Sequence, residues 1–266
     1  MEATTRGQVT GSAAEGYEAL LVPALFQAWA PRIVDAAGLS PGERVLDVAC
    51  GTGVLAREAA TRVSPAGSVV GLDCNDGMLD VARHTSPNID WRLGQAEALP
   101  FEDDSFDAVL SQFGLMFFED RVSALREMRR VLDAGGNLAV AVWDSLDNTP
   151  GYAALTGLLQ SLFGDHVAEG LRSPYALGNP EELLSLFVAA GISNAQVRTE
   201  KGLARYPSIE AWVHTDVTAW TISDLIDDAQ YELLLKTAQK QLKPFEKSDG
   251  RVEFLAPAHI VTVTNM

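Results

Sequence analysis

The chain has 266 residues, of which 47% are hydrophobic and 21% charged, so it is long enough for one large domain with a full hydrophobic core. Its formal net charge of −16 at pH 7 argues against nucleic acid as a partner, because that binding depends on clustered lysine and arginine. With two cysteines, a polar start that lacks the apolar stretch of a secretory signal, and no apolar run near the roughly 18 residues of a membrane span, we expect a cytoplasmic protein without a disulfide framework.

The first half of the chain alternates strand-like and helical patterns, which is typical of a parallel sheet covered by helices. We expect a flexible arm over residues 1–16 and a single domain over 17–266, whose core, 17–144, begins with a helix over 17–37. Strands are predicted over 43–49, 67–73, 89–95, 105–118 (running into a loop) and 135–144. Helices are predicted between them, over 53–63, 75–85 and 121–132.

The pattern changes after residue 144. Residues 145–192 show no strand pattern, and helices over 151–164 and 180–191 predict a helical insertion, or lid. Residues 193–266 are expected to complete the sheet, with a strand within 194–208 and helices over 208–222 and 227–245. The closing segment 250–265 predicts either a strand pair or one long bent strand.

A glycine turn joins the first strand to its helix in the stretch RVLDVACGTGVLAREAA, residues 44–60. Gly51, Gly53 and Ala56 fit a G-x-G-x-x-A pattern that also serves dinucleotide-binding proteins. Asp47 lies in the strand beside this turn, where its charge would repel a pyrophosphate and favour a ligand with a positive charge. S-adenosylmethionine carries an ammonium and a sulfonium, and its carboxylate suits the amides of a helix start. Asp73, at the end of the second strand, can accept from ribose hydroxyls of either nucleotide.

Four motifs occur in order over residues 42–143: VLDVACGTG, VVGLDCNDGML, GQAEALPFEDDSFDAV and REMRRVLDAGGNLAVAVW. With them the chain resembles the class I S-adenosylmethionine-dependent methyltransferases, above all the small-molecule branch that includes the ubiquinone and menaquinone biosynthesis enzymes. The resemblance implies a Rossmann-like three-layer α/β sandwich, whose seven-stranded sheet is mostly parallel with one antiparallel strand near the C-terminus. It also implies S-adenosylmethionine as methyl donor and S-adenosylhomocysteine as product.

The same resemblance implies roles for individual residues. The glycine turn would wrap the methionine moiety, Asp73 would hold the ribose, and Gln95, where the family often has Asp, would contact the adenine edge. The backbone carbonyls at the end of the fourth strand would bind the ammonium. The full set of expected cofactor-binding residues is Asp47, Ala49, Gly51, Gly53, Asp73, Cys74, Met78, Gln95, Ala96, Glu97, Ser111 and Gln112.

The acceptor is expected to be a small apolar or aromatic molecule, bound between the first helix, the end of the fifth strand and the lid. Candidate pocket residues are Tyr17, Phe113, Leu115, Trp143, Tyr152, Arg172 and Tyr175. A general base is needed only for an acceptor that stays protonated, and His166 and His214 are the candidates, although a structural role suits each of them better. No metal site, no nucleic-acid partner and no membrane span is expected, and the protein would be a monomer or homodimer. The alternatives are a protein that binds the cofactor without methyl transfer and a nicotinamide-dependent oxidoreductase, which Asp47 disfavours.

Overall fold

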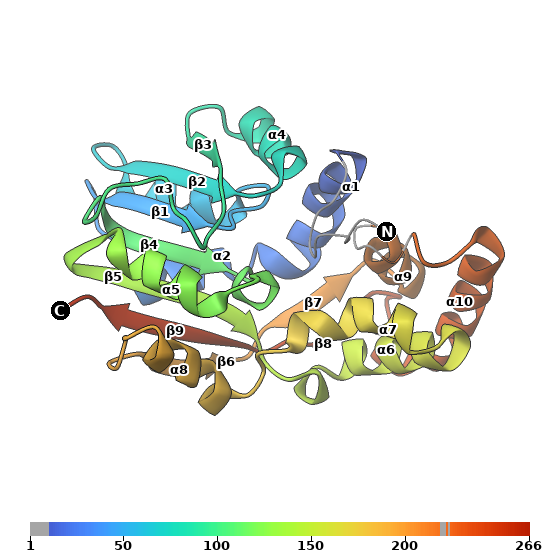
Figure 1. Ribbon diagram of the computed structural model, residues 1–266. Coiled ribbons are helices and arrows are strands. Elements are labelled where there is room, and N and C mark those ends of the chain that lie inside the picture. The colour runs from blue at the N-terminus through green and yellow to red at the C-terminus, as the bar shows by residue number, and fades with distance from the viewer. Residues whose placement is uncertain (1–10, 219–221, 223) are drawn as a thin grey trace, which may run out of the picture.

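The computed structural model describes residues 11–218, 222 and 224–266, and its central feature is a seven-stranded sheet of order β3-β2-β1-β4-β5-β9-β6 (Figure 1). Strand β9 runs antiparallel to both of its neighbours, whereas the other adjacent strands are parallel. The expected mostly parallel sheet with one antiparallel strand is therefore confirmed. The strands are β1 Arg44–Val48, β2 Ser68–Asp73, β3 Asp90–Leu93, β4 Phe106–Gln112, β5 Leu132–Trp143, β6 Gln196–Glu200 and β9 Ala258–Thr264.

Helices cover both faces of this sheet, which makes the three-layer sandwich (Figure 1). Helices α2 (Ala30–Ala37) and α3 (Val54–Val63) pack together on one face, and α5 (Arg121–Arg130) and α8 (Pro180–Ala189) pack together on the other. Helix α4 (Asp76–Thr85) packs beside β2 and β3. Among the described residues, no helix has the length and apolar character needed to cross a membrane.

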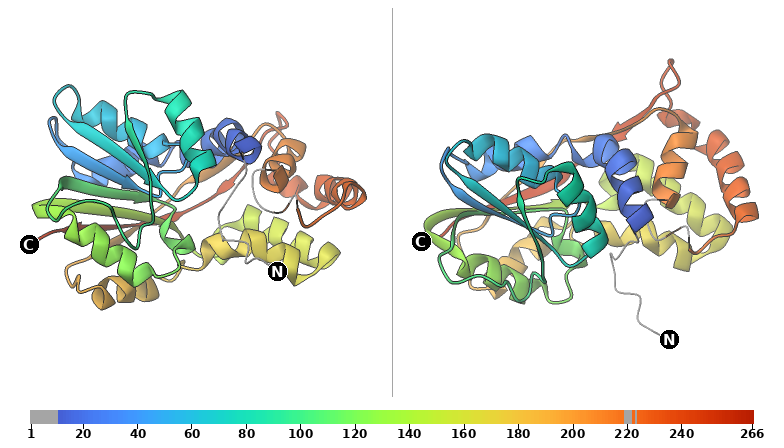
Figure 2. Two further views of the ribbon diagram at one scale, coloured as in Figure 1. Left: turned by 45° about the horizontal axis from the view of Figure 1, so that its top comes forward. Right: turned by 90° about the horizontal axis from the view of Figure 1, so that it is seen from above.

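The chain begins, in the described residues, with a helical segment that lies between the sheet and the rest of the molecule (Figure 2). Helix α1 (Gly11–Gly16) continues into the π-helix η1 (Tyr17–Phe26), so the described part of the expected arm is helical, while residues 1–10 lie outside the description. Helix α1 packs against α4. Together α1 and η1 form what we call the N-terminal segment.

A second group of elements, the cap, stands beyond the carboxyl ends of the strands (Figures 1 and 2). It adjoins the sheet at η2 (Leu115–Phe117) and η3 (Leu146–Asn148). Its elements are α6 Pro150–Phe163, α7 Asp165–Arg172, η4 Ser173–Tyr175, α9 Ile209–Thr218, α10 Asp228–Gln241, η5 Lys243–Phe245 and the two-stranded sheet of β7 Leu203–Tyr206 and β8 Val252–Leu255. Helix α9 and strand β7 contact η1, so the N-terminal segment also borders the cap.

The elements that make up the cap differ from those expected for the helical insertion. The segment 145–192 is helical, but α7 was not predicted, and α8 packs on α5 and β6 rather than in the cap. The strand expected within 194–208 and the closing strand segment are each divided between the two sheets. Gly202 lies between β6 and β7, at the point where the chain passes from one sheet to the other. The ring of Trp29 packs so close to this glycine that a Cβ there would lie 2.3 Å from the ring. Pro257, which lacks an amide hydrogen for a ladder, lies at the corresponding point between β8 and β9.

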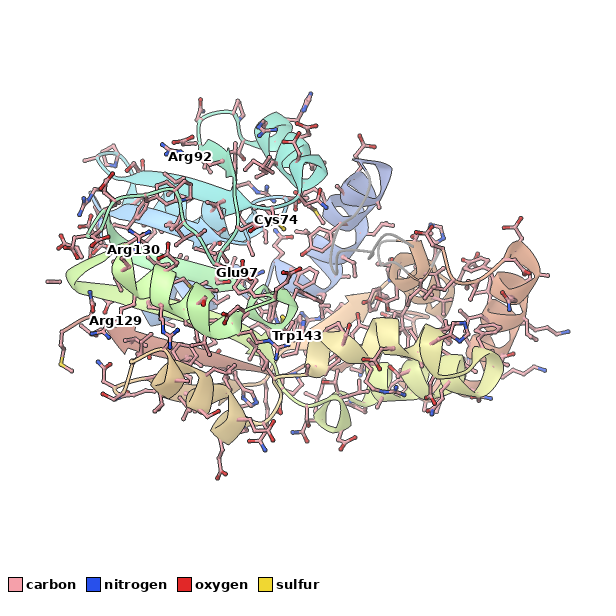
Figure 3. The ribbon with its side chains drawn as sticks, in the orientation of Figure 1. Cys74, Arg92, Glu97, Arg129, Arg130 and Trp143 are labelled. Atoms are coloured by element: carbon pink, nitrogen blue, oxygen red, sulfur yellow. The ribbon has the colours of Figure 1, made fainter. Side chains whose placement is uncertain are left out.

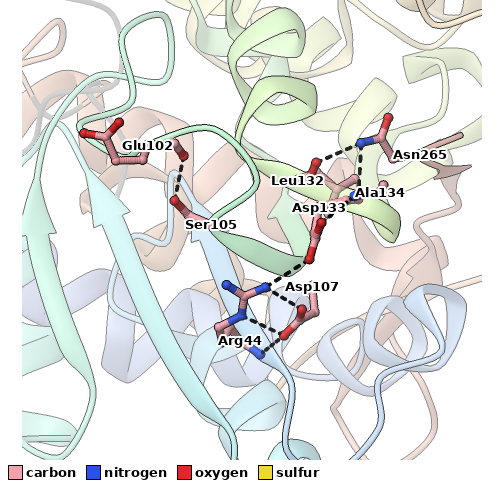
Figure 4. Close-up of polar contacts among 8 residues, drawn as sticks. All are labelled: Arg44, Glu102, Ser105, Asp107, Leu132, Asp133, Ala134 and Asn265. Carbon is pink, nitrogen blue, oxygen red and sulfur yellow. Dashed lines mark hydrogen bonds and ion pairs between the residues drawn. The ribbon is translucent and has the colours of Figure 1, made fainter.

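The amino ends of the strands are closed by ionic contacts (Figure 4). Arg44 donates to both carboxylate oxygens of Asp107, at 2.6 and 3.0 Å, and lies 3.4 Å from Asp133. The bonded guanidinium lowers the pKa of Asp107 below its usual value. Asn265 donates to the backbone carbonyl of Leu132, which fastens the end of the chain to this edge. These contacts hold the amino ends of β1, β4 and β5 together.

Candidate cofactor and acceptor site

The sheet order reverses between β1 and β4, and their carboxyl ends define the crevice where open α/β sheets bind ligands. Asp47 lies near the end of β1, in register with Gly71 of β2 and Leu110 of β4. The carboxyl ends of these three strands therefore lie side by side. Figure 3 shows Cys74, Glu97 and Trp143 along this carboxyl edge, whereas Arg129 and Arg130 lie toward the other end of the sheet.

The loop after β1 has a backbone that few residues can adopt. Ala49, Gly51 and Gly53 all have positive φ, of 59°, 54° and 91°. A Cβ at Gly53 would lie 2.3 Å from the indole of Trp91, so that glycine is required for packing inside the protein. A Cβ at Gly51 would meet nothing within 4 Å, so this glycine borders open space. The loop thus leaves space for a ligand beside Gly51, while Gly53 anchors the loop against Trp91.

Asp73 fixes the shape of this loop from the end of β2. One carboxylate oxygen accepts from the amide of Gly51 at 2.8 Å, and the other from the amide of Asn75 at 2.9 Å. Burial raises the pKa of Asp73, and the amide hydrogen bonds from Asn75 and Gly51 act in the opposite direction. Asn75 in turn accepts from the amide of Met78 and caps α4. Asp73, which is expected from the sequence to bind the ribose, therefore also links the loop after β1 to the end of β2.

Hydrogen-bond acceptors with no partner occur in β1 and β4, near the strand ends beside this loop. Both carboxylate oxygens of Asp47, the hydroxyl of Ser111 and Oε1 of Gln112 are buried and make no hydrogen bond among the described residues. Burial raises the pKa of Asp47 well above its usual value, and this is not offset by the charge of Arg57 or by the backbone amide of Ala56, which lies nearby without making a hydrogen bond of normal geometry. Buried acceptors need donors. The ammonium of a methionine moiety supplies three, so these residues fit the cationic end of S-adenosylmethionine.

The residues expected around the adenine are found on both sides of the crevice. Cys74 is exposed at the end of β2, and Met78 is buried in the first turn of α4. Gln95 is exposed, and Ala96 beside it is buried. Glu97 accepts from the backbone amides that precede α5, so its carboxylate holds that loop in place. Gln95 and Ala96 are thus better placed than Glu97 to meet a ligand.

Aromatic side chains form the floor beside the end of β4. Phe113 has a φ of 56°, unusual for a bulky residue, and its ring stacks on Trp143 with centroids 3.7 Å apart. Phe26 and Trp29 pack against the same pair, and we call these four residues the aromatic wall. Strained backbone persists where the surroundings enforce it and often marks a functional site. Leu115, also expected in the acceptor pocket, is fully buried in η2 beside this wall.

The N-terminal segment closes the crevice from above. Burial, followed by the nearby charges of Asp73, Glu18 and Asp47, raises the pKa of Tyr17, so this side chain lies beside the two carboxylates. Arg57 of α3 donates to Glu18 at 2.7 Å and to the carbonyl of Thr52 in the glycine loop at 2.7 Å. The expected pocket residue Tyr17 is therefore placed over the cofactor half of the site.

The remaining acceptor candidates lie in the cap. Tyr152 is buried, and its ring packs 6.0 Å from that of Tyr175. Arg172 turns outward to ion pairs with Glu169 and Asp165. It therefore does not join the tyrosines.

The candidate histidines are both exposed. His166 lies on the surface of α7, and His214 faces the hydroxyl of Tyr231 at 3.4 Å on the outside of α9. The buried ionisable side chain of α9 is Asp216, which sequence reasoning missed. The available signal was an acidic residue at helical spacing among apolar ones in AWVHTDV. Within the described ranges, no three His, Cys, Asp or Glu side chains gather as metal ligands do.

Comparison with known proteins gives consistent relatives. The model of the ubiE/COQ5 methyltransferase family matches residues 11–154. The demethylmenaquinone methyltransferase of Renibacterium salmoninarum is 49% identical over 114 residues, which is 42% of this chain and 46% of that protein, so the chain spans about half of this relative. The demethylmenaquinone methyltransferase of Staphylococcus aureus is 34% identical over 188 residues, 65% of this chain and 78% of that protein.

A solved structure is similar over a longer stretch. Phosphoethanolamine N-methyltransferase 2 of Haemonchus contortus, in complex with phosphomonomethylethanolamine and S-adenosylhomocysteine, has a TM-score of 0.62 and 20% identity. The match covers 98% of this chain and 59% of that one. At this identity the likeness concerns the fold, which includes the cap region as well as the sheet.

Proposed function

The chain belongs to the ubiE/COQ5 methyltransferase family, and from this we propose that it transfers the methyl group of S-adenosylmethionine to a carbon or oxygen of a small aromatic acceptor of the hydroquinone class. The observation that carries the cofactor half is the set of buried acceptors without partners at Asp47, Ser111 and Gln112. A purely anionic ligand would leave them unsatisfied and add repulsion. A ligand with an ammonium group satisfies them.

The acceptor half is supported by the relatives and by the aromatic wall. The relatives in Renibacterium and Staphylococcus are demethylmenaquinone methyltransferases by name, so their acceptor is a quinone derivative. In this chain, the rings of Phe113 and Trp143 stack on each other next to Ser111 and Gln112, and both are almost fully buried. Such dry aromatic surroundings suit a flat aromatic acceptor, because aromatic rings gain from packing together beyond the area that they bury.

The proposed roles of the residues follow from these positions. Asp47, Ser111 and Gln112 hold the ammonium, the open side of the glycine loop at Gly51 borders the carboxylate, and Asp73 binds the ribose. S-adenosylmethionine, when bound, supplies an electrophilic methyl group on a sulfonium. The chain then has to align an acceptor atom in line with that methyl and exclude water; orientation alone can supply about 7–11 kcal/mol. Tyr17 and the aromatic wall provide the dry surroundings.

Two measurements test the proposal. Calorimetric titration with S-adenosylhomocysteine and with NAD should give binding of the first and none of the second. Incubation with methyl-labelled S-adenosylmethionine and a reduced, demethylated naphthoquinone should then give a labelled product, identified by mass spectrometry. Absence of S-adenosylhomocysteine binding would overturn the cofactor assignment. Binding without transfer to hydroquinones or phenols would overturn the acceptor class and leave a protein that binds the cofactor for another purpose.

A further inference from the structure

The interior of the cap contains a polar cluster that the proposed function does not yet use. It consists of Tyr152 on α6, Tyr206 on β7 and Asp216 on α9. The hydroxyls of Tyr152 and Tyr206 are hydrogen bonded to each other, and Tyr152 also donates to Asp216 at 3.2 Å. These side chains are only 1–2% exposed. We call this group the cap cluster.

The surroundings of the cap cluster are apolar. Trp212 and Phe254 pack around the rings of Tyr152 and Tyr206. Burial, together with the charge of Asp216, raises the pKa of both tyrosines well above the usual value, so their hydroxyls keep their protons and act as donors. Apolar residues of similar volume would pack such an interior without burying a carboxylate. The polar groups therefore call for a role beyond filling space.

Two further donors lie next to the cluster. The hydroxyl of Thr156 and the indole N–H of Trp212 are buried and have no hydrogen-bond partner among the described residues. Thr156 follows Tyr152 by one turn of α6, and Trp212 precedes Asp216 by one turn of α9, so each shares a helix face with a cluster member. Buried donors without acceptors are uncommon in native proteins. A ligand oxygen that enters this region would satisfy them.

The cap cluster sits on the elements through which the cap meets the cofactor half of the molecule. Strand β7 and helix α9 contact η1, which carries Tyr17 (Figure 2). Tyr175 packs against Tyr152, and its turn η4 contacts both β5 and η2, the elements that border the aromatic wall. The cluster is thus connected to the proposed methyl-transfer site by contacts on two sides.

We propose that the cap cluster is the polar recognition site for the acceptor, and that Asp216 accepts a hydrogen bond from a hydroxyl group of an aromatic diol. Thr156 and Trp212 donate to oxygen atoms of the same molecule. The inference rests on the proposed function, which it deepens by assigning the residues that select a hydroxylated ring over a plain one. It also gives the cap a reason to hold a carboxylate in an apolar interior.

The test uses the full chain loaded with S-adenosylhomocysteine and two probes, dihydroxynaphthalene and its dimethoxy derivative, titrated by calorimetry. Wild type should bind the diol more tightly, because only the diol can donate to Asp216. Asp216→Asn should weaken diol binding by about 10- to 100-fold, the range for a hydrogen bond to a charged group. Tyr206→Phe removes the hydroxyl that is bonded to Tyr152 and should weaken diol binding by a smaller factor, and both variants should leave the binding of the dimethoxy compound and of S-adenosylhomocysteine unaffected. Tyr231→Phe, which removes an exposed hydroxyl on α10, is the matched control and should change nothing.

The outcomes separate the two proposals. If both variants keep the wild-type preference for the diol, or lose only thermal stability, the cluster is structural and the inference is wrong even when methyl transfer is seen. If wild type binds the diol through Asp216 but transfers no methyl group, the proposed function fails and the recognition site stands. Should Asp216→Asn not fold, Tyr206→Phe decides, because it removes a single oxygen atom and keeps the ring.

Discussion

The carboxylate of Asp73 accepts a hydrogen bond of 2.8 Å from the amide of Gly51, which ties the glycine loop after β1 to the end of β2 across 22 residues. The amides of Gly51 and Asn75 bond different oxygens of Asp73, the amide of Cys74 adds a third hydrogen bond, and an ionised carboxylate has about four acceptor positions. The same side chain can therefore shape the loop and still receive ribose hydroxyls. Loss of Asp73 should affect the cofactor site twice, once through the ribose and once through the loop.

We expect Asp73→Ala to weaken the binding of S-adenosylhomocysteine by roughly 10- to 100-fold, equivalent to about 1.5–3 kcal/mol for hydrogen bonds to a charged group. Asp73→Asn should lose less, because its amide oxygen can still accept from Gly51. Isothermal titration of both variants checks the order. Equal affinity in wild type and Asp73→Ala would show that the ribose is held elsewhere.

Asp47→Asn should stabilise the ligand-free protein and weaken cofactor binding at the same time. The wild-type carboxylate is buried with no hydrogen-bond partner, and burial raises its pKa. Removing the charge relieves that penalty, and each gain of about 1 kcal/mol in a chain of this size raises Tm by about 2–4 °C. Calorimetry without and with S-adenosylhomocysteine measures both effects. A variant that is less stable and binds normally would contradict the assignment of Asp47 to the ammonium.

The stability gain of Asp47→Asn should also depend on pH, with a sign fixed by the raised pKa of Asp47. Below the unfolded value of about 3.9 the carboxyl group is protonated in both states, so charge makes no difference. Above it, the unfolded chain releases the proton that the folded protein retains, and wild type loses stability as pH rises toward the folded pKa. Urea unfolding across this pH window should show that the unfolding free energy of Asp47→Asn, relative to that of wild type, increases as pH rises. A difference between the two proteins that stays constant or narrows would exclude Asp47 as the source of the pH dependence.

Two alanine substitutions in the glycine loop should separate folding from binding. Gly53→Ala places a methyl group 2.3 Å from Trp91, whose indole N–H is fixed by a 2.9 Å bond to the carbonyl of Ser86. We expect a loss of about 2–4 kcal/mol in unfolding free energy from overpacking and positive φ. Gly51→Ala meets open space and should lose only about 1–2 kcal/mol, yet its methyl group would enter the ligand's position and abolish binding.

The control for these variants is Gly250→Ala, a glycine with φ of 85° and open space around it, far from the site in the sequence. It should show the backbone strain alone, and cofactor affinity should not change. Denaturant unfolding and S-adenosylhomocysteine titration of all three proteins test the comparison. The interpretation fails if Gly51→Ala binds as well as Gly250→Ala does.

We expect that replacing the buried His259 lowers the stability of the protein, and that replacing the exposed His166 or His214 does not. His259 is buried, with its ring nitrogens 2.8 Å from the Thr199 hydroxyl and 3.0 Å from the Gly178 carbonyl, so His259→Phe leaves both without a partner. We expect a loss of about 2–4 kcal/mol in unfolding free energy. His166→Ala and His214→Ala change exposed residues and should alter stability by less than about 0.5 kcal/mol and leave the methyl-transfer rate unchanged. A large drop in the methyl-transfer rate of either variant would instead support that histidine as the general base.

The elements of the sheet and its first helices could be predicted from the sequence because each is specified by a pattern of neighbouring residues. Strands β1, β2 and β4 and helices α3 to α5 occur where apolar periodicity placed them. Asp47, Asp73 and Ser111 come at or near strand ends, and the carboxyl ends of parallel strands meet at one edge of a sheet. The same rule predicted that the glycine loop after β1 lies at this end of the sheet. In the cap, by contrast, the pairing of the elements could not be predicted from the sequence.

What only the tertiary structure decided are pairings between distant segments. Tyr152 meets Tyr206 and Asp216 across 54 and 64 residues, and no periodicity within α6 or α9 specifies that contact. The division of 194–208 and 250–265 between two sheets likewise depends on Trp29 packing against Gly202, more than 170 residues along the chain. Local patterns report which face of an element is apolar. Which other element covers that face is settled by the packing of the whole chain, and that packing brought Asp216 into the interior and left His166 and His214 at the surface.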